Sequence, residues 1–179
     1  MAINTLQEKF MHELGDIYDA EHQFLKGQEE MLKNATDQAL KEMITNHISQ
    51  TQQQIRNLEG VYRALGRQPE RVMCDGARGI VSEGQKIMKE TAADNQLRDC
   101  AIAGAASKVE HYEISSYRGL ILGAELMGQQ EVVSLLQQNL EQEESTARLI
   151  EQSAPQLLQK AMGGTNIQSG QFSQATPTY

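Results

Sequence analysis

The sequence predicts an all-α fold, a bundle of four long helices. Apolar residues recur at spacings of three and four along most of the 179 residues, as they do on the buried face of a helix. Proline occurs only at positions 69, 155 and 177, so long stretches carry no helix breaker. The signals that mark strands, alternating β-branched runs and Asn-Gly hairpin turns, are missing.

We expect four long helices, over 4–34, 37–65, 95–126 and 129–161. Each has about thirty residues and would be ~45 Å long. The connections after the first and the third helix are very short, so each pair forms an antiparallel hairpin. The segment between the hairpins, 66–94, is long and contains a shorter helix expected over Ala77–Glu90. Two hairpins joined by one long crossover is the ferritin-like arrangement.

The ends of these helices carry recognisable signals. Thr36 or Asp37 can cap the second helix and Asp94 the third, because short polar side chains accept hydrogen bonds from the free amides of a first turn. Pro155 is expected to kink or break the fourth helix. We expect the bundle to span 1–162 and the uncharged tail 163–179, rich in Gly, Ser, Gln and Thr, to be flexible or loosely docked.

Composition narrows the classes of partner. Acidic residues outnumber basic ones by 24 to 16, which argues against a protein held on nucleic acid by bulk charge. No apolar run approaches the ~18 residues of a membrane span, and the first residues do not form a signal peptide. Cys74 and Cys100 are too few for a disulfide framework or a Cys-based zinc site. We therefore expect a cytoplasmic protein with free thiols and no nucleic-acid or membrane partner.

Each long helix breaks its apolar stripe near the middle with an acid or a histidine. The residues concerned are Glu21, His47, Glu110, Glu113 and Glu143. Counted from the hairpin turns at 1.5 Å per residue, all of them lie within about one or two turns of mid-height. We therefore expect these side chains to converge on one point, with Gln50 and Tyr117 beside them.

Carboxylates that meet in a dry core need a partner. Each bare charge costs several kcal/mol unless it is paired, protonated or bound to a metal. Lys108 and Arg118 are near in sequence but lie off the stripes. A lone acid in a stripe is more often paired or solvated, and a lone histidine is more often hydrogen-bonded, so the hypothesis rests on all five together. Oxygen-rich sites with one or two histidines in helical bundles suit iron or manganese.

Four stretches of the chain carry a family resemblance. They are FMHELGDIYDAEHQ (10–23), NHISQTQQQIRNLE (46–59), KVEHYEISSYRGL (108–120) and LLQQNLEQEES (135–145). In this order, over roughly 5–155, the chain resembles the YciE/YciF stress-protein family, and KVEHYEI is the most specific part.

The resemblance implies a ferritin-like bundle, a homodimer and a centre of two metal ions. Carried over by position, its motif residues are Glu21, His47, Glu110, Glu113 and Glu143. The family pattern has acids where this chain has Gln50 and Gln142, and glutamine is a poorer, neutral ligand.

Two functions stay open on these observations. The first is a ferritin-like stress-response protein that holds one or two iron or manganese ions and acts on oxygen or peroxide. The second is a non-catalytic stress or interaction protein without metal, whose acids are protonated or hydrogen-bonded to Gln50, Thr51 and Tyr117. A storage cage is a third and requires many subunits.

Overall fold

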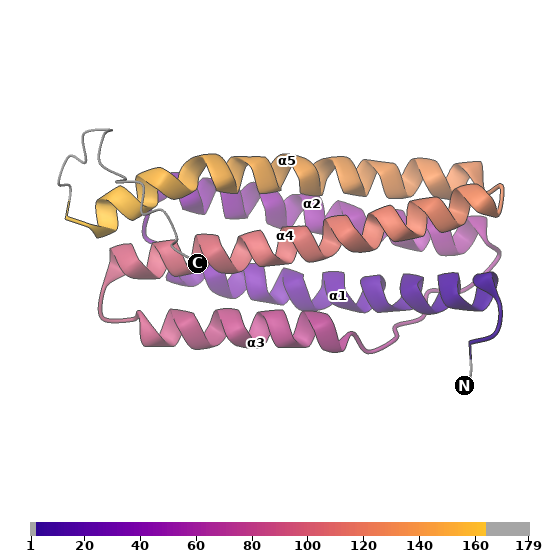
Figure 1. Cartoon of the computed structure of the whole chain (residues 1–179), viewed down its shortest axis with the longest axis horizontal. Helices are drawn as coiled ribbons and strands as arrows, with labels where there is room; N and C mark the ends of the chain where they lie inside the picture. Colours follow the sequence, from indigo (N-terminus) through magenta and orange to yellow (C-terminus); the bar gives the residue numbers. More distant parts are fainter. Residues whose placement is uncertain (1–2, 164–179) are drawn as a thin grey trace, which may run out of the picture.

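The computed structural model describes residues 3–163, and the secondary structure in this range is entirely α-helical (Figure 1). The helices are α1 (Leu6–Asn34), α2 (Gln38–Ala64), α3 (Asp75–Glu90), α4 (Asn95–Leu126) and α5 (Gln130–Ala161). The predicted all-α class is confirmed, and each predicted helix end lies within two residues of the observed one. None of the described helices combines the length and apolarity needed to cross a membrane. The predicted tail lies, apart from Gly163, outside the described residues.

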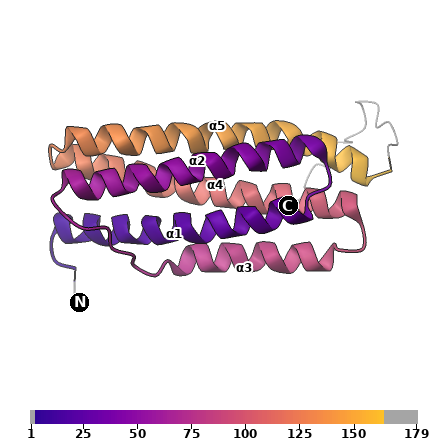
Figure 2. The same ribbon diagram turned by 180° about the vertical axis from the view of Figure 1, so that it is seen from behind.

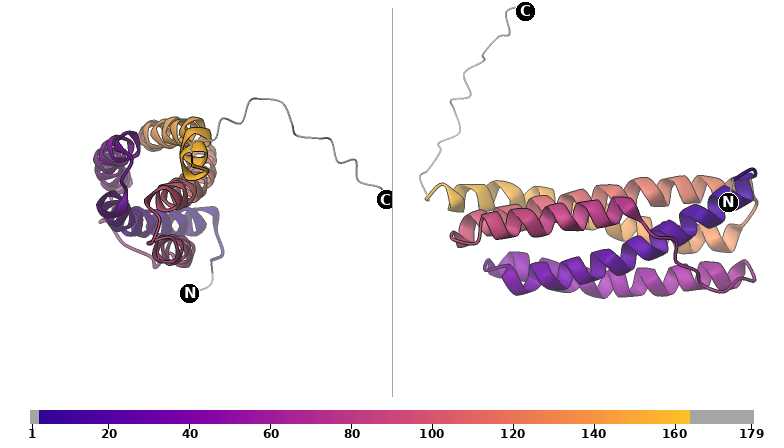
Figure 3. Two further views of the ribbon diagram at one scale, coloured as in Figure 1. Left: turned by 90° about the vertical axis from the view of Figure 1, so that its left-hand side faces the viewer. Right: turned by 90° about the horizontal axis from the view of Figure 1, so that it is seen from below.

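The four long helices lie side by side, and α3 runs along the outside of this group (Figures 1 and 2). Helices α1 and α5 each pack against both α2 and α4, so each contacts its hairpin partner and one helix of the other hairpin. The end-on view in Figure 3 shows the four long helices around a common interior. The shorter α3 packs against α1 and α4, so it covers the seam between the first and the third long helix.

Capping side chains define where the helices begin. Thr5 and Glu8 form a capping box at the start of α1. Of the two candidates for α2, Asp37 rather than Thr36 is the cap, since its carboxylate accepts a hydrogen bond from a first-turn amide at 3.0 Å. Asp94 caps α4 as predicted. Each cap is worth roughly 1 kcal/mol.

Pro155 was expected to kink or break this helix, and the break does not occur, because α5 continues through this residue to Ala161. Proline removes a single amide hydrogen from the helical ladder, and the turns after it remain anchored by Leu157, which is buried. The alternative expectation was a kink, and the last turns of α5 bend away from the axis of the helix (Figure 1).

Two apolar clusters fill the interior, one towards each end of the long helices. One contains Leu14, Leu58 and Leu136, and the other contains Ile44 and Ile102. Between them lies the level at which the sequence places its polar stripe residues. The polar residues are therefore sealed from both ends by packed aliphatic side chains.

A buried acid that the sequence analysis did not single out fastens the α1–α2 turn to α4. Asp99 accepts hydrogen bonds from the amide of Thr36 at 2.7 Å, from its hydroxyl at 2.6 Å and from the amide of Asp37 at 2.8 Å. The side chain of Asp99 reaches across 62 or more positions of sequence to make these bonds.

We predict that Asp99→Ala lowers the free energy of unfolding by about 2–4 kcal/mol, because three donors of the α1–α2 turn lose a buried, charged acceptor. Urea denaturation followed by circular dichroism measures this. Glu141→Ala, at an exposed position of α5, is the control and is expected to change stability by less than about 0.5 kcal/mol. Equal stability of the two variants would contradict the role given to Asp99.

Candidate metal centre

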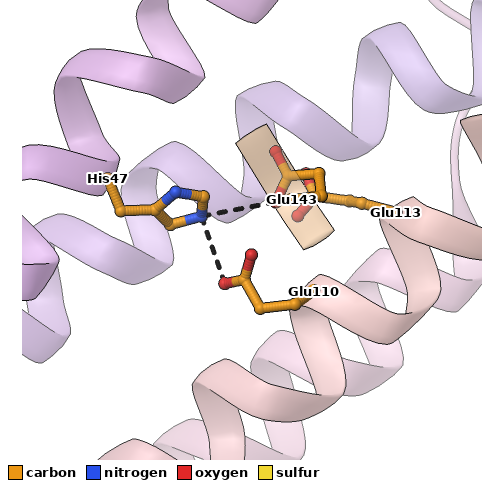
Figure 4. A group of neighbouring side chains, drawn as sticks. All are labelled: His47, Glu110, Glu113 and Glu143. Carbon is orange, nitrogen blue, oxygen red and sulfur yellow. Dashed lines mark ion pairs between the residues drawn. The ribbon is translucent and has the colours of Figure 1, made fainter. Parts of the chain in front are cut away.

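Four of the predicted site residues meet in the interior (Figure 4). His47 comes from α2, Glu110 and Glu113 from α4 and Glu143 from α5. One ligand atom of each lies within 4.8 Å of the others. His47 Nε2 is 3.1 Å from Glu110 Oε1 and 3.7 Å from Glu143 Oε2. All four side chains are buried, so the expected convergence occurs for these residues.

Glu21 of α1 lies beside these four residues. It is fully buried, and the hydroxyl of Tyr117 donates a hydrogen bond to its Oε1. Its charge helps to raise the pKa of Glu113, and the charge of Glu143 in turn helps to raise the pKa of Glu21. Glu21 is not one of the four residues whose ligand atoms share the 4.8 Å neighbourhood, so it stands at the edge of the cluster.

The predicted neighbours Gln50 and Tyr117 take separate places around the cluster. Gln50 Oε1 lies 3.3 Å from His47 Nδ1 and accepts a hydrogen bond from Thr146 at 3.2 Å. When Nδ1 carries the proton, it donates to Gln50, and Nε2 then turns its lone pair to the acids. Thr51, expected beside the acids in a metal-free protein, pairs instead with Gln28 of α1 at 3.0 Å.

Sequence reasoning missed two amides at this level. Gln54, noted only as a neighbour of the stripe, donates a hydrogen bond to Glu143 Oε1. Asn139 donates to the hydroxyl of Tyr117 at 3.0 Å and is fully buried. Its position was a usable signal, since Asn139 follows Leu136 by three residues and precedes Glu143 by four, which places it on the same face of the helix.

Burial controls the protonation of the acids. Removal from water, followed in importance by the charge of Glu143, raises the pKa of Glu21 to about 8. Desolvation likewise raises the pKa of Glu110 to about 7. The pKa values of Glu113 and Glu143 rise well above the usual range for the same first reason, with neighbouring carboxylates adding to it. Without a cation, the cluster therefore holds protons at neutral pH.

The donor set fits a cation. Among the described buried atoms, Oε2 of Glu21, Glu110 and Glu143, and both carboxylate oxygens of Glu113, lack a hydrogen-bond partner. No Lys or Arg between residues 3 and 163 forms an ion pair with these acids: Lys108 pairs with Glu83 at 2.6 Å and Arg118 with Glu144 at 2.7 Å, both on the outside. Carboxylate oxygens with one imidazole nitrogen are ligands that iron and manganese accept.

A small cavity adjoins the cluster on the side of His47 and Glu110. Its other walls are largely apolar and include Phe24, Ile44 and Val109. The space next to the ligand atoms is thus shielded by hydrocarbon, which strengthens every electrostatic interaction inside it.

Fold and site define an all-helical protein with a buried cluster of glutamates and one histidine between its long helices. The chain belongs to the family described as Domain of unknown function (DUF892), whose model matches residues 5–163. It is similar to Protein YciF of Escherichia coli strain K12, with 31% identity over 147 residues that cover 82% of this chain and 88% of that protein. The predicted membership of the YciE/YciF stress-protein family is confirmed.

Solved structures share the fold. The crystal structure of the E. coli stress protein YciF matches with a TM-score of 0.83 and 30% identity, covering 88% of this chain and 99% of that one. YcfI of Rhodopseudomonas palustris matches with a TM-score of 0.81 and 36% identity, over 83% and 94% of the two chains. The protein XCC3681 of Xanthomonas campestris, 22% identical with a TM-score of 0.71, covers 90% of this chain and 98% of its own and shares the fold.

The raised pKa values predict how stability depends on pH in the presence of a chelator. A group whose pKa is about 8 in the folded state and about 4.5 in the unfolded state stabilises the fold fully below pH 4.5. This stabilisation is lost as the pH rises from 4.5 through 8, because the unfolded state releases the proton readily over this range and the folded state releases it only near pH 8.

Glu113→Gln replaces one of these acids by a neutral amide, so we predict that the variant loses less stability than the wild type between pH 5.5 and pH 8. The expected difference in the change of Tm is on the order of 3 °C or more. Thermal melts in EDTA measure it, with the exposed Glu141→Gln as the control. Parallel curves for wild type and Glu113→Gln would contradict the electrostatic account.

Proposed function

We propose that the chain is a ferritin-like stress-response protein that holds one or two iron or manganese ions between its helices and acts on oxygen or peroxide. The ligands would be Glu21, His47, Glu110, Glu113 and Glu143. The observation that carries this proposal is the set of buried carboxylate oxygens without a hydrogen-bond partner and without an internal Lys or Arg to neutralise them. In the proposed arrangement the hairpins α1–α2 and α4–α5 form the bundle, and α3 lies in the crossover.

A bound iron or manganese ion would supply one-electron chemistry towards oxygen or peroxide. The chain would provide the ligand oxygens and an apolar surrounding. Glu113 offers two unpartnered oxygens at the centre of the cluster, and Glu110 and Glu143 each offer one. The walls of the cavity beside His47 and Glu110 are largely apolar, which disfavours water on this side of the site.

His47 would be held in position by Gln50. A ligating imidazole commonly donates its other ring N–H to a fixed acceptor, which sets the tautomer and the orientation of the ring. Gln50 Oε1 is placed at 3.3 Å for this bond and is itself held by Thr146. In this proposal Gln50 orients the imidazole and does not bind the ion, which accounts for a neutral side chain at this position.

The proposal predicts that a divalent metal stabilises the folded state. Protein stripped with EDTA and then mixed with Mn²⁺ at about 100 times its dissociation constant should gain about 2.7 kcal/mol, or roughly 5–10 °C in Tm, because only the folded state presents the site. If the Mn²⁺ concentration is set in this way at pH 8 and then kept the same, the gain should be smaller at pH 6, since the acids must release protons to bind the ion.

Glu113→Gln should abolish most of the gain, and Glu141→Gln on the exposed face should retain it. A melting temperature that neither Mn²⁺, Fe²⁺ nor chelator alters would contradict the proposed function.

One observation favours the alternative, a non-catalytic helical stress or interaction protein without metal. Two of the acids are already held by neutral donors: Tyr117 donates to Glu21, and Gln54 donates to Glu143. If the remaining oxygens keep their protons at neutral pH, the cluster is stable without an ion. This alternative requires the metal-independent melting that would contradict the first proposal.

We also propose that the protein is a cytoplasmic homodimer without nucleic-acid or membrane partners. The support is the resemblance to the YciE/YciF family, together with the acidic composition. Light scattering behind size-exclusion chromatography should give twice the mass of the 19.9 kDa chain. A monomer would contradict the dimer, and an assembly of many subunits would favour the storage cage instead.

A further inference from the structure

A series of hydrogen bonds between side chains runs through the interior to Glu21. Asn57 Nδ2 donates to Asn139 Oδ1 at 2.7 Å. Asn139 Nδ2 donates to the hydroxyl of Tyr117 at 3.0 Å, and this hydroxyl donates to Glu21 Oε1. At the outer end, the amide of Gln53 donates to Asn57 Oδ1 at 2.9 Å. The series therefore crosses from the exposed face of α2 through α5 and α4 to α1.

Every bond in this series points the same way, with the donor on the outer side. The orientation of Asn139 fixes this direction, because all its polar atoms have partners. Its amide nitrogen also reaches the backbone carbonyl oxygen of Gln54 at 3.3 Å, and its oxygen accepts from Asn57. Reversing the amide would place two oxygens, or two nitrogens, against one another. Asn139 must therefore donate to Tyr117, and the hydrogen of the Tyr117 hydroxyl is left for Glu21.

The inner members of the series are buried. Asn139 and Tyr117 are fully buried, and Asn57 is 7% exposed. A buried polar group without its partner costs about 1–3 kcal/mol, so such a set is a liability unless all of it is satisfied. Gln53 is exposed, so water competes for its hydrogen bond to Asn57. The positioning of Glu21 therefore depends on the buried members of the series.

We propose that Asn139, acting through Tyr117, positions Glu21 for a cation. This inference rests on the proposed function. The Tyr117 hydroxyl occupies Oε1 of Glu21 and leaves Oε2 as its one unpartnered oxygen. The same pattern recurs at Glu143, where the amide of Gln54 occupies Oε1 and Oε2 is unpartnered. Each of these acids is thus held by one neutral donor and keeps one oxygen without a hydrogen-bond partner.

The first test measures Mn²⁺ affinity by calorimetry at a fixed pH. Groups that orient ligands typically alter metal affinity by about 10–100-fold, so Asn139→Leu is expected to weaken binding by at least about 10-fold. Asn139→Ala is the second variant and guards against a loss of folding caused by the bulk of leucine. Its side chain cannot donate to Tyr117 either, so binding should weaken here as well.

The matched control is Thr51→Val. It breaks another buried side-chain hydrogen bond, the pair of Thr51 with Gln28, for which no hydrogen bond to the acids is found among the described residues. We expect it to lower stability and to leave Mn²⁺ affinity within about 2-fold of the wild type. Wild-type affinity in both Asn139 variants, or an equal loss in Thr51→Val, would overturn the proposal.

The second test uses the metal-free protein and does not depend on the proposed function. A buried, hydrogen-bonded phenolic proton exchanges slowly with water, so the Tyr117 hydroxyl should give a resolved proton NMR signal that disappears in Tyr117→Phe. This signal should shift or vanish in both Asn139 variants and persist in Thr51→Val. An unchanged signal in the Asn139 variants would show that Asn139 does not position Tyr117. A wild type that binds no Mn²⁺ would instead contradict the proposed function.

Discussion

The structure depends on the cost of burying four carboxyl groups in one dry volume. Glu21, Glu110, Glu113 and Glu143 lie between two apolar clusters, and no Lys or Arg of the described residues pairs with them. Water cannot solvate these groups, so they must be protonated, hydrogen-bonded or bound to a cation. The raised pKa values indicate that the acids keep protons, and Tyr117 and Gln54 donate hydrogen bonds to two of them. The oxygens left without a partner are the reason for proposing the third.

This constraint explains features that would otherwise be unrelated. The amides and hydroxyls around the acids are neutral, so they can satisfy one oxygen without competing with a cation for charge. Gln50 can orient His47 and adds no further negative charge to the cluster. Asn139 has all its polar atoms bonded, which allows a buried amide at little cost and gives the hydroxyl of Tyr117 a single direction. The surrounding groups restrict the geometry of the acids and leave the Oε2 atoms of Glu21 and Glu143 without a hydrogen-bond partner.

Much of the fold could be predicted because it depends on local signals. Apolar spacing and capping residues gave the helix ends within two residues, and the position of each polar residue along its helix gave the level of the cluster. Spacing does not give rotation about the axis or the distance between neighbouring helices. It could not show that Glu21 stands beside the tightest four residues rather than among them.

Contacts between residues distant in sequence also escaped prediction. Asn57 and Asn139 are separated by 82 positions, and either amide alone would suit a solvated surface. The hydrogen bonds of Asp99 to the α1–α2 turn also join residues that are far apart in the sequence. The sequence left open whether Pro155 kinks or breaks α5; the helix continues because a proline late in a helix removes one hydrogen bond and Leu157 beyond it is buried.

The most direct measurement is anomalous diffraction from a crystal of the protein soaked in Mn²⁺, with data collected on both sides of the manganese absorption edge. The account predicts a peak bonded to Glu113 and to Nε2 of His47, with the unpartnered oxygens of the other acids turned towards it. Absence of a peak at this place, with the acids paired to one another through shared protons, would contradict it.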